Sequence, residues 1–130
     1  MAKKKRGAAA QDTPSGDRVV TRNRRAYHDY HIGDTIEAGL VLTGSEIKSI
    51  RDGKITISEA YVRVIDGELW LIGAHISPYE HGAYANHDPD RNRKLLAHRR
   101  QIEDLAEQVD RKGMTLVPLM VVLRRGRAKL

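Results

Sequence analysis

The sequence predicts one mainly β domain, a small barrel that is closed or partly open, with about three short helices inserted into it. Three observations lead to this class. The chain has 130 residues, enough for one domain with a real core. Strand patterns come first, between residues 35 and 76, and include a two-residue hairpin signal. The strongest helical period comes late, between residues 99 and 111. This order differs from the strand–helix alternation of a βαβ sheet.

The first 22 residues are rich in Lys, Ala, Gly and small polar side chains, and they show almost no apolar period. Such a composition buries too little apolar surface to offset the entropy of ordering the chain. Residues 1–22 are therefore predicted to be a disordered basic arm, and residues 23–130 are predicted to form the folded domain.

The first strand is expected at Thr35–Thr43, where apolar side chains occupy every second position. Gly39 inside this run suggests a bulge, a bend or a close approach of the backbone. Ser45 is a suitable N-cap for a short helix at Glu46–Asp52, and Gly53 can end that helix.

A hairpin is expected next, with strands at Ala60–Ile65 and Glu68–Ile76. The dipeptide Asp66-Gly67 between them is a strong two-residue turn signal. Ser77–Asp90 contains Pro, Gly and Asn, so it is predicted to be a loop or an irregular edge segment.

Two helices are expected after this loop. Asp88 can serve as an N-cap and Pro89 suits the first helical position, which predicts a short helix at Pro89–Ala97. An apolar stripe with i, i+3, i+4, i+7 spacing predicts a longer helix at Arg99–Arg111, and Gly113 stops it.

The last part of the chain returns to strand patterns. Thr115–Leu123 is rich in β-forming residues, and Pro118 places this run at a sheet edge or turns its backbone nitrogen outward. Arg125-Gly126 is a turn signal that leads into a strand at Arg127–Leu130. Because no partner strand follows, we expect the natural protein to continue beyond Leu130.

The chain is basic, with a formal net charge of +6 and a pI near 9.8. It lacks Cys, which excludes disulfides and thiolate metal sites and fits a reducing compartment, with the cytosol as the default. It also lacks an apolar run long enough to cross a bilayer and a secretory signal. All charged residues in Arg91–Arg100 are basic, and Arg124–Lys129 is a second basic run. Segregated cations indicate nucleic acid first and an anionic membrane second.

Three kinds of residue invite a chemical role. Glu37 could act as a general base, could be a plain surface carboxylate, or could hold an arginine in place or read a base edge. Loop histidines 75, 81 and 87 match no compact ligand spacing, so no metal site is predicted. Tyrosines 27, 30, 79 and 84 flank basic or Asn-containing segments, where they could stack on bases or fill the core.

Three segments carry a resemblance to a known family. They are Asn-Arg-Arg-Ala-Tyr-His-Asp-Tyr (23–30), Glu-Ala-Gly-Leu-Val-Leu-Thr-Gly-Ser-Glu-Ile-Lys-Ser-Ile-Arg (37–51) and Asn-His-Asp-Pro-Asp-Arg-Asn-Arg-Lys-Leu-Leu-Ala-His (86–98). Together with Gly-Met-Thr-Leu-Val-Pro-Leu (113–119) and Arg-Gly-Arg-Ala-Lys-Leu (125–130), they resemble the SsrA-binding protein family, also called small protein B. The resemblance runs in order from Asn23 to Leu130.

The resemblance implies an OB-like antiparallel β-barrel that binds the tRNA-like domain of tmRNA, the SsrA RNA of trans-translation. Proteins of this family bring alanyl-tmRNA to the A site of stalled 70S ribosomes, and they meet elongation factor Tu indirectly through that RNA. The resemblance therefore implies a cytoplasmic binding protein rather than an enzyme, without a cofactor and without a membrane partner. The family's basic C-terminal tail has no counterpart in these 130 residues.

The resemblance also implies a set of RNA-binding residues. They are Asn23, Arg24, Glu37, Lys48, Asn86, Arg91, Arg93, Lys94, Leu96 and Lys129. Two other functions stay open at this point. One is a small ribonuclease that uses Glu37, an arginine and a loop histidine, and the other is a general OB-fold module for single-stranded RNA.

Overall fold

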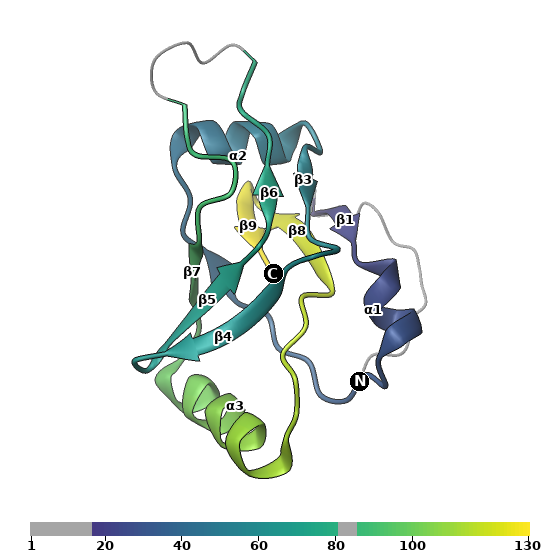
Figure 1. Cartoon of the computed structure of the whole chain (residues 1–130). Helices are drawn as coiled ribbons and strands as arrows, with labels where there is room; N and C mark the ends of the chain where they lie inside the picture. The colour runs from purple at the N-terminus through teal and green to yellow at the C-terminus, as the bar shows by residue number, and fades with distance from the viewer. Residues whose placement is uncertain (1–16, 81–85) are drawn as a thin grey trace.

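The computed structural model describes residues 17–80 and 86–130, and this part of the chain is mostly antiparallel sheet with three helices (Figure 1). The strands are β1 (Arg18–Arg22), β2 (Gly39–Leu40), β3 (Ile55–Thr56), β4 (Tyr61–Ile65), β5 (Glu68–Ile72), β6 (His75–Ile76), β7 (Arg93–Leu96), β8 (Met120–Arg124) and β9 (Arg127–Lys129). The helices are α1 (Arg24–Asp29), α2 (Gly44–Arg51) and α3 (Arg99–Lys112). The predicted class, mainly β with inserted helices, is confirmed.

The strands form a seven-stranded antiparallel sheet in the order β1-β8-β9-β2-β7-β5-β4, beside a two-stranded sheet of β3 and β6. The large sheet bends around the core, so that β4 and β5 lie across the core from β8 and β9 (Figure 1). The strands β1 and β4 are the two edges of the order and do not pair with each other. The described residues therefore form a curved, open sheet.

Both predicted turn signals form tight hairpins. Asp66 and Gly67 have φ angles of 52° and 77°, and Arg125 and Gly126 have φ angles of 52° and 80°. Two consecutive residues with positive φ match the twist of antiparallel strands, which is why Asp-Gly favours this turn. Gly73, with a φ of 84°, divides the predicted strand Glu68–Ile76 into β5 and β6.

Helix α2 confirms the predicted helix at Glu46–Asp52, but its N-cap is Thr43 rather than Ser45. The Thr43 hydroxyl accepts a hydrogen bond from the Glu46 backbone N–H at 3.4 Å, and the Glu46 carboxylate accepts one from the Thr43 backbone N–H at 2.8 Å. This reciprocal capping box satisfies two backbone donors, whereas a cap at Ser45 would satisfy one.

The predicted helix at Pro89–Ala97 is wrong, because Arg93–Leu96 is strand β7 between β2 and β5. Asp88 and Pro89 form a turn instead of a helix start, in which the Asp88 side chain accepts from the Asp90 backbone N–H at 2.9 Å. In β7, Arg93 and Leu95 point into the core as alternate residues of a strand. The sheet thus overrides the local helix signal.

The predicted basic arm, residues 1–22, includes residues that belong to the sheet. Arg18–Arg22 are strand β1, which pairs with β8 through partners such as Arg22 and Met120. Backbone hydrogen bonds to β8 order these residues, and Val20 packs against the apolar core. Residues 1–16 of the predicted arm lie outside the described residues.

The remaining predictions differ in detail. Helix α3 confirms Arg99–Arg111, and Gly113 ends it in the left-handed conformation at a φ of 66°. The strand predicted at Thr35–Thr43 is only Gly39–Leu40 in the sheet, and that predicted at Thr115–Leu123 starts at Met120. The sequence analysis did not predict helix α1, whose N-cap is Asn23.

One apolar cluster fills the space inside the bent sheet. Its buried members come mainly from the strands and α2, and they include Ile50, Leu69, Leu71, Leu95 and Val121. Helix α3 packs against this cluster through Ile102 and Leu105, as its apolar stripe predicts. Among the described residues, none of the helices has the length and apolar character needed to cross a membrane.

Candidate nucleic-acid interface

The structure separates the predicted site residues into two main groups. One group lies around Gly39 and the groove beside it, on α1, β7, β8 and β9 and on the chain just before β2. The other group lies at α2 and the segment that leads into β7. We call the first group the sheet-face site. It contains the predicted residues Arg24, Glu37, Leu96 and Lys129, and the structure adds Arg22 and Arg124 to it.

The sheet-face site is centred on Gly39. The antiparallel register places Gly39 opposite Leu96 of β7 on one side and opposite Lys129 of β9 on the other. A Cβ atom at Gly39 would lie 3.6 Å from the Leu96 Cβ and 3.8 Å from the Lys129 Nζ. The glycine therefore leaves the backbone of β2 open between a cation and a leucine that is 56% exposed.

Glu37 is ordered by an arginine. The Arg124 Nε donates to Glu37 at 2.8 Å, and its Nη1 donates to Asp17 at 3.1 Å. The hydrogen bond to Glu37 is the main reason that the pKa of Arg124 lies above its ordinary value. Of the three roles that the sequence leaves open for Glu37, the structure supports a carboxylate that holds an arginine in place.

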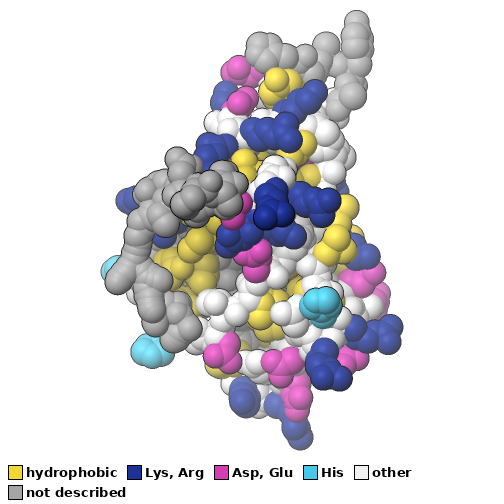
Figure 2. Space-filling view, turned by 180° about the vertical axis from the view of Figure 1, so that it is seen from behind, with side chains coloured by type: hydrophobic (Ala, Val, Ile, Leu, Met, Phe, Trp, Pro, Cys, Tyr) yellow, Lys and Arg dark blue, Asp and Glu magenta, His cyan; other side chains and the backbone are white. Residues whose placement is uncertain are grey.

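An open groove beside this ion pair connects it to α1. Arg22, Arg24, Glu37 and Arg124 all line the groove. Tyr27 and Tyr30 line it as well, and they are 43% and 49% exposed, so these two tyrosines do not fill the core. Figure 2 shows Lys and Arg side chains gathered with acidic side chains midway along one face of the molecule. The sequence prediction missed Arg22 and Arg124 as members of this site, although Arg124 belongs to the second basic run.

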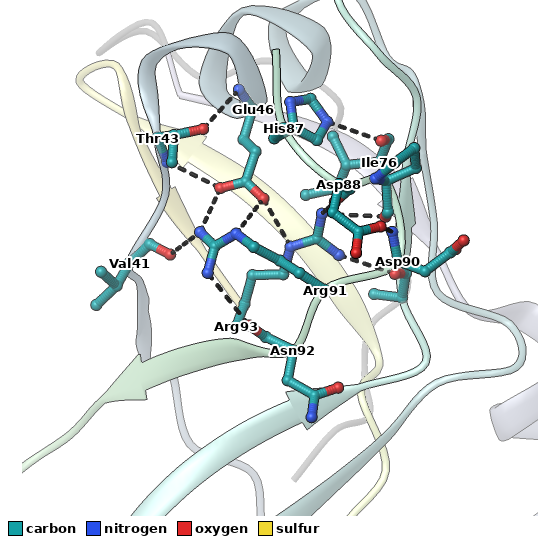
Figure 3. Close-up of polar contacts among 12 residues, drawn as sticks. Val41, Thr43, Glu46, Ile76, His87, Asp88, Asp90, Arg91, Asn92 and Arg93 are labelled. Atoms are coloured by element: carbon teal, nitrogen blue, oxygen red, sulfur yellow. Dashed lines mark hydrogen bonds and ion pairs between the residues drawn. The ribbon is translucent and has the colours of Figure 1, made fainter. Parts of the chain in front are cut away.

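The second group is organised by one buried carboxylate (Figure 3). Glu46 has no exposed surface, and its two oxygens accept from Arg91 at 2.6 and 2.9 Å and from the Arg93 Nε at 2.8 Å. Burial alone would raise the pKa of the Glu46 carboxyl. The hydrogen bonds from Arg91, the Thr43 backbone and Arg93 outweigh that effect and hold this pKa below its ordinary value.

Two predicted RNA-binding residues are interior residues in this structure. Arg93 has no exposed surface, and its guanidinium donates to the carbonyls of Ala74, Asp88 and Pro89 as well as to Glu46. Asn23 is 3% exposed. Its side chain caps α1 and donates to the Pro118 carbonyl at 2.9 Å. The polar groups of both side chains are already satisfied inside the fold, and their contact with RNA stays a prediction.

The remaining predicted residues are Lys48 and Asn86, which are exposed near α2, and Lys94, which is partly exposed on β7. The Lys48 Nζ lies 5.6 Å from the centroid of the Tyr79 ring, within the range of a cation–π contact. Asn86 is exposed, and its side chain bonds the Tyr79 backbone through both its oxygen and its nitrogen. Lys94 lies on β7 and pairs with Glu68 at 2.7 Å. Tyr84 and His81 lie outside the described residues.

The loop histidines His75 and His87 each bond to a neighbouring group. His75 pairs with Asp90 at 2.8 Å. The His87 Nε2 donates to the Ile76 carbonyl, and its Nδ1 contacts Ser45. In the described part of the chain, no group of three or more His, Cys, Asp or Glu side chains could hold a metal ion.

The fold and this site define a class of protein: a small, basic, antiparallel-sheet domain that presents arginine and lysine side chains on one outer face. A sequence model of the family described as "SmpB protein" matches residues 20–130. The chain belongs to the SmpB family.

Curated relatives agree with this assignment. An SsrA-binding protein from Roseiflexus sp. (strain RS-1) is 59% identical over 115 residues, which cover 88% of this chain and 73% of the relative. An SsrA-binding protein from Streptococcus agalactiae serotype III (strain NEM316) is 53% identical over 112 residues, which cover 86% and 72%.

A solved structure shows the same fold. Its description is "tmRNA-SmpB: a journey to the center of the bacterial ribosome", and one of its chains is 50% identical to this chain, with a TM-score of 0.69. The match covers 84% of this chain and 77% of that chain.

Proposed function

We propose that this chain binds tmRNA, the SsrA RNA, through its tRNA-like domain and acts in trans-translation. In that process it would help to rescue stalled 70S ribosomes by bringing alanyl-tmRNA to the A site, and it would meet elongation factor Tu only through that RNA. This proposal places the protein in the cytoplasm. Membership of the SmpB family supports the function most directly.

The sheet-face site is the surface that we assign to the RNA. Structured RNA is recognised through its shape, its phosphates and 2′-hydroxyls, and a few unstacked bases. Arg24 and Lys129 can meet phosphates, while Leu96 offers an apolar contact beside them. The ordered pair of Glu37 and Arg124 adds a fixed donor and acceptor pattern, which favours specificity over bulk attraction.

The bent sheet supports an OB-like barrel as the architecture of residues 23–130, with β1 as an added edge strand. A barrel of this kind presents one curved outer face to a nucleic acid while the core stays filled with side chains. The charge distribution agrees with this use, because the two basic runs contribute Lys94 of β7 and Arg124, Arg127 and Lys129 of β8 and β9.

The ribonuclease alternative has little geometric support. A general base must reach the proton that it removes and must have a pKa suited to that step. Glu37 is instead bound to a guanidinium, and the loop histidines His75 and His87 bond other groups. We therefore propose a binding protein without catalytic activity, cofactor or metal.

The test compares two labelled RNAs of equal length, the tRNA-like domain of tmRNA and an unrelated hairpin. We expect a stable complex with the tRNA-like domain, weaker binding to the hairpin and no cleavage of either RNA. Preference for an unstructured RNA would indicate a general single-strand binder, and cleavage would indicate a nuclease. Either result would overturn the proposal.

Matched variants tie the binding to the sheet face. Lys129→Gln removes a cation from the proposed surface, and Arg111→Gln removes one from α3, where Arg111 pairs with Glu107 on the exposed side of the helix. We expect the first change to weaken binding and the second to leave it unchanged. Equal effects would mean that binding depends on net charge alone.

A further inference from the structure

Three residues form a row across the outer face of the other half of the sheet. Trp70 in the middle of β5 is paired with Arg63 of β4 on one side and with Lys94 of β7 on the other. Paired residues of adjacent antiparallel strands lie about 5 Å apart and point to the same face. The register therefore places an indole ring between two cations.

The burial pattern shows which face this is. Leu69 and Leu71 flank Trp70 in the chain and are 1% and 0% exposed, so they point into the core. Because side chains alternate along a strand, Trp70 points to the opposite side. Arg93 and Leu95 are likewise buried on either side of Lys94. Figure 1 shows β4 and β5 at the front of the molecule, across the core from β8 and β9.

Trp70 itself is half-buried, and other apolar groups on this face are exposed. Tyr61 and Ile65 of β4 are 45% and 38% exposed, and Leu96 of β7 is 56% exposed. The cations beside them are only partly neutralised. Lys94 pairs with Glu68, but Arg63 has no ion-pair partner among the residues that the structure describes. A partly exposed aromatic and aliphatic surface beside this arginine suits a partner that is both flat and anionic.

We propose that Arg63, Trp70 and Lys94 form a stacking platform for an unpaired nucleotide of RNA. A nucleobase stacks on the indole ring, while its flanking phosphates lie against the two cations. An aromatic ring binds any base in this way, so the platform accepts an unpaired nucleotide without a strict sequence requirement. This inference rests on the proposed RNA-binding function and adds a contact surface separate from the pair of Glu37 and Arg124.

The chain offers a direct probe, because Trp70 is its one tryptophan. Stacking of a base on the indole ring should quench the fluorescence of Trp70, whereas RNA bound at another surface of the protein should not. The full chain is titrated with three RNAs: an octamer of uridine, a blunt duplex of similar charge, and the tRNA-like domain of tmRNA. We expect quenching by the octamer and little quenching by the duplex, whose bases are already stacked.

The tRNA-like domain shows whether tmRNA itself supplies the nucleotide. Quenching by this domain identifies tmRNA as the source. Quenching by the octamer alone supports the platform and assigns the nucleotide to another RNA, such as that of the ribosome. Binding of the tRNA-like domain without quenching in any titration would overturn the platform and leave the proposed function intact. Quenching by the octamer with no binding of the tRNA-like domain would support the platform and overturn the proposed function.

Variants separate stacking from folding. Trp70→Leu should lower the affinity for the octamer by roughly 5- to 150-fold, and Trp70→Phe should keep most of the affinity because it keeps a ring. Arg63→Gln should weaken the quenching at low salt, while Arg111→Gln on α3 should not. Circular dichroism confirms that each variant is folded. Equal affinity of Trp70→Leu and the unchanged protein for the octamer would refute the proposal.

Discussion

Glu46 and Arg93 form an ion pair of 2.8 Å in which neither side chain has any exposed surface. The two residues are 47 positions apart in the chain, and the pair joins the first turn of α2 to the first residue of β7. Arg91 binds the same carboxylate from the segment just before β7. One buried glutamate thus holds a helix, a turn and a central strand together.

The first prediction concerns the stability that this carboxylate provides. Glu46→Gln keeps the shape of the side chain but leaves Arg93 as an uncompensated buried charge. We expect the free energy of unfolding to fall by about 3–5 kcal/mol. Urea denaturation measures this loss. Glu107→Gln on α3 is the control, because its exposed pair with Arg111 is worth about 0–1 kcal/mol. A loss as small as that of the control would show that the buried pair is energetically neutral.

The second prediction is the pH dependence of the same pair. Because the pKa of Glu46 in the folded protein lies below the ordinary glutamate value of 4.5, the carboxylate contributes stability that is fully present above that value. This contribution is lost as the pH falls through the lower, folded-state pKa. The unfolding free energy of Glu46→Gln should therefore depend less on pH below 4.5 than that of the unchanged protein. Parallel pH profiles for the two proteins would contradict the assignment.

The third prediction separates binding from stability at Glu37. Glu37 and Arg124 are 43% and 45% exposed, so their ion pair contributes only about 0–1 kcal/mol to stability. If the pair orders a donor for RNA, Glu37→Ala should weaken binding to the tRNA-like domain by about 1–3 kcal/mol with little change in melting temperature. Glu107→Ala is the matched control for binding. A large loss of stability with unchanged affinity would make Glu37 a structural residue.

The fourth prediction compares two glycines. Alanine fits at Gly39, where its Cβ would make ordinary contacts, so Gly39→Ala should leave stability unchanged or raise it by up to about 1 kcal/mol. The added methyl fills the gap between Leu96 and Lys129, so RNA affinity should fall. Gly73→Ala should instead lower stability by about 1–3 kcal/mol, because Gly73 has a φ of 84° and a Cβ would lie 3.2 Å from the Glu59 carbonyl oxygen. Urea denaturation of both variants decides the comparison.

The fifth prediction is the salt dependence of RNA binding. If about five to seven cations meet phosphates, log K should fall with log salt with a slope of about −3.5 to −6. Lys129→Gln should make this slope less steep by roughly 0.7–0.9 if the lysine contacts one phosphate. Filter binding between low and moderate salt gives both slopes. A slope near zero would show that the cations of this protein do not contact phosphates in the complex.

Local signals explain which elements the sequence predicts well. The two hairpin turns depend on adjacent residues with positive φ, and α3 depends on a regular apolar stripe with Gly113 at its end. Each of these signals is complete within a few residues. Asp88 and Pro89 are an equally local signal for a helix, but it fails because Arg93 occupies a core position.

Strand β7 could not be predicted from its own residues. An arginine in the core is stable only because Glu46 and three carbonyl groups surround it, and two of these partners, Glu46 and Ala74, come from distant parts of the chain. Glu37 and Arg124 are 87 positions apart, so the sequence could suggest an arginine partner for Glu37 but could not identify it. The correct N-cap of α2 could have been predicted from the sequence, because Thr43 and Glu46 have the spacing of a capping box.

The strand order also governs when this sheet can form as the chain is made. The neighbour of β1 in the sheet is β8, and Gly39 of β2 pairs with Lys129 of β9. These pairings can form only after about 90 to 100 further residues have been made. The hairpin of β4 and β5 can form earlier, because its two strands are adjacent in the chain. Contacts between distant residues close large loops and slow folding. Synthesis of β8 and β9 is therefore the event that lets β1 join the sheet and completes the pairing on both sides of β2.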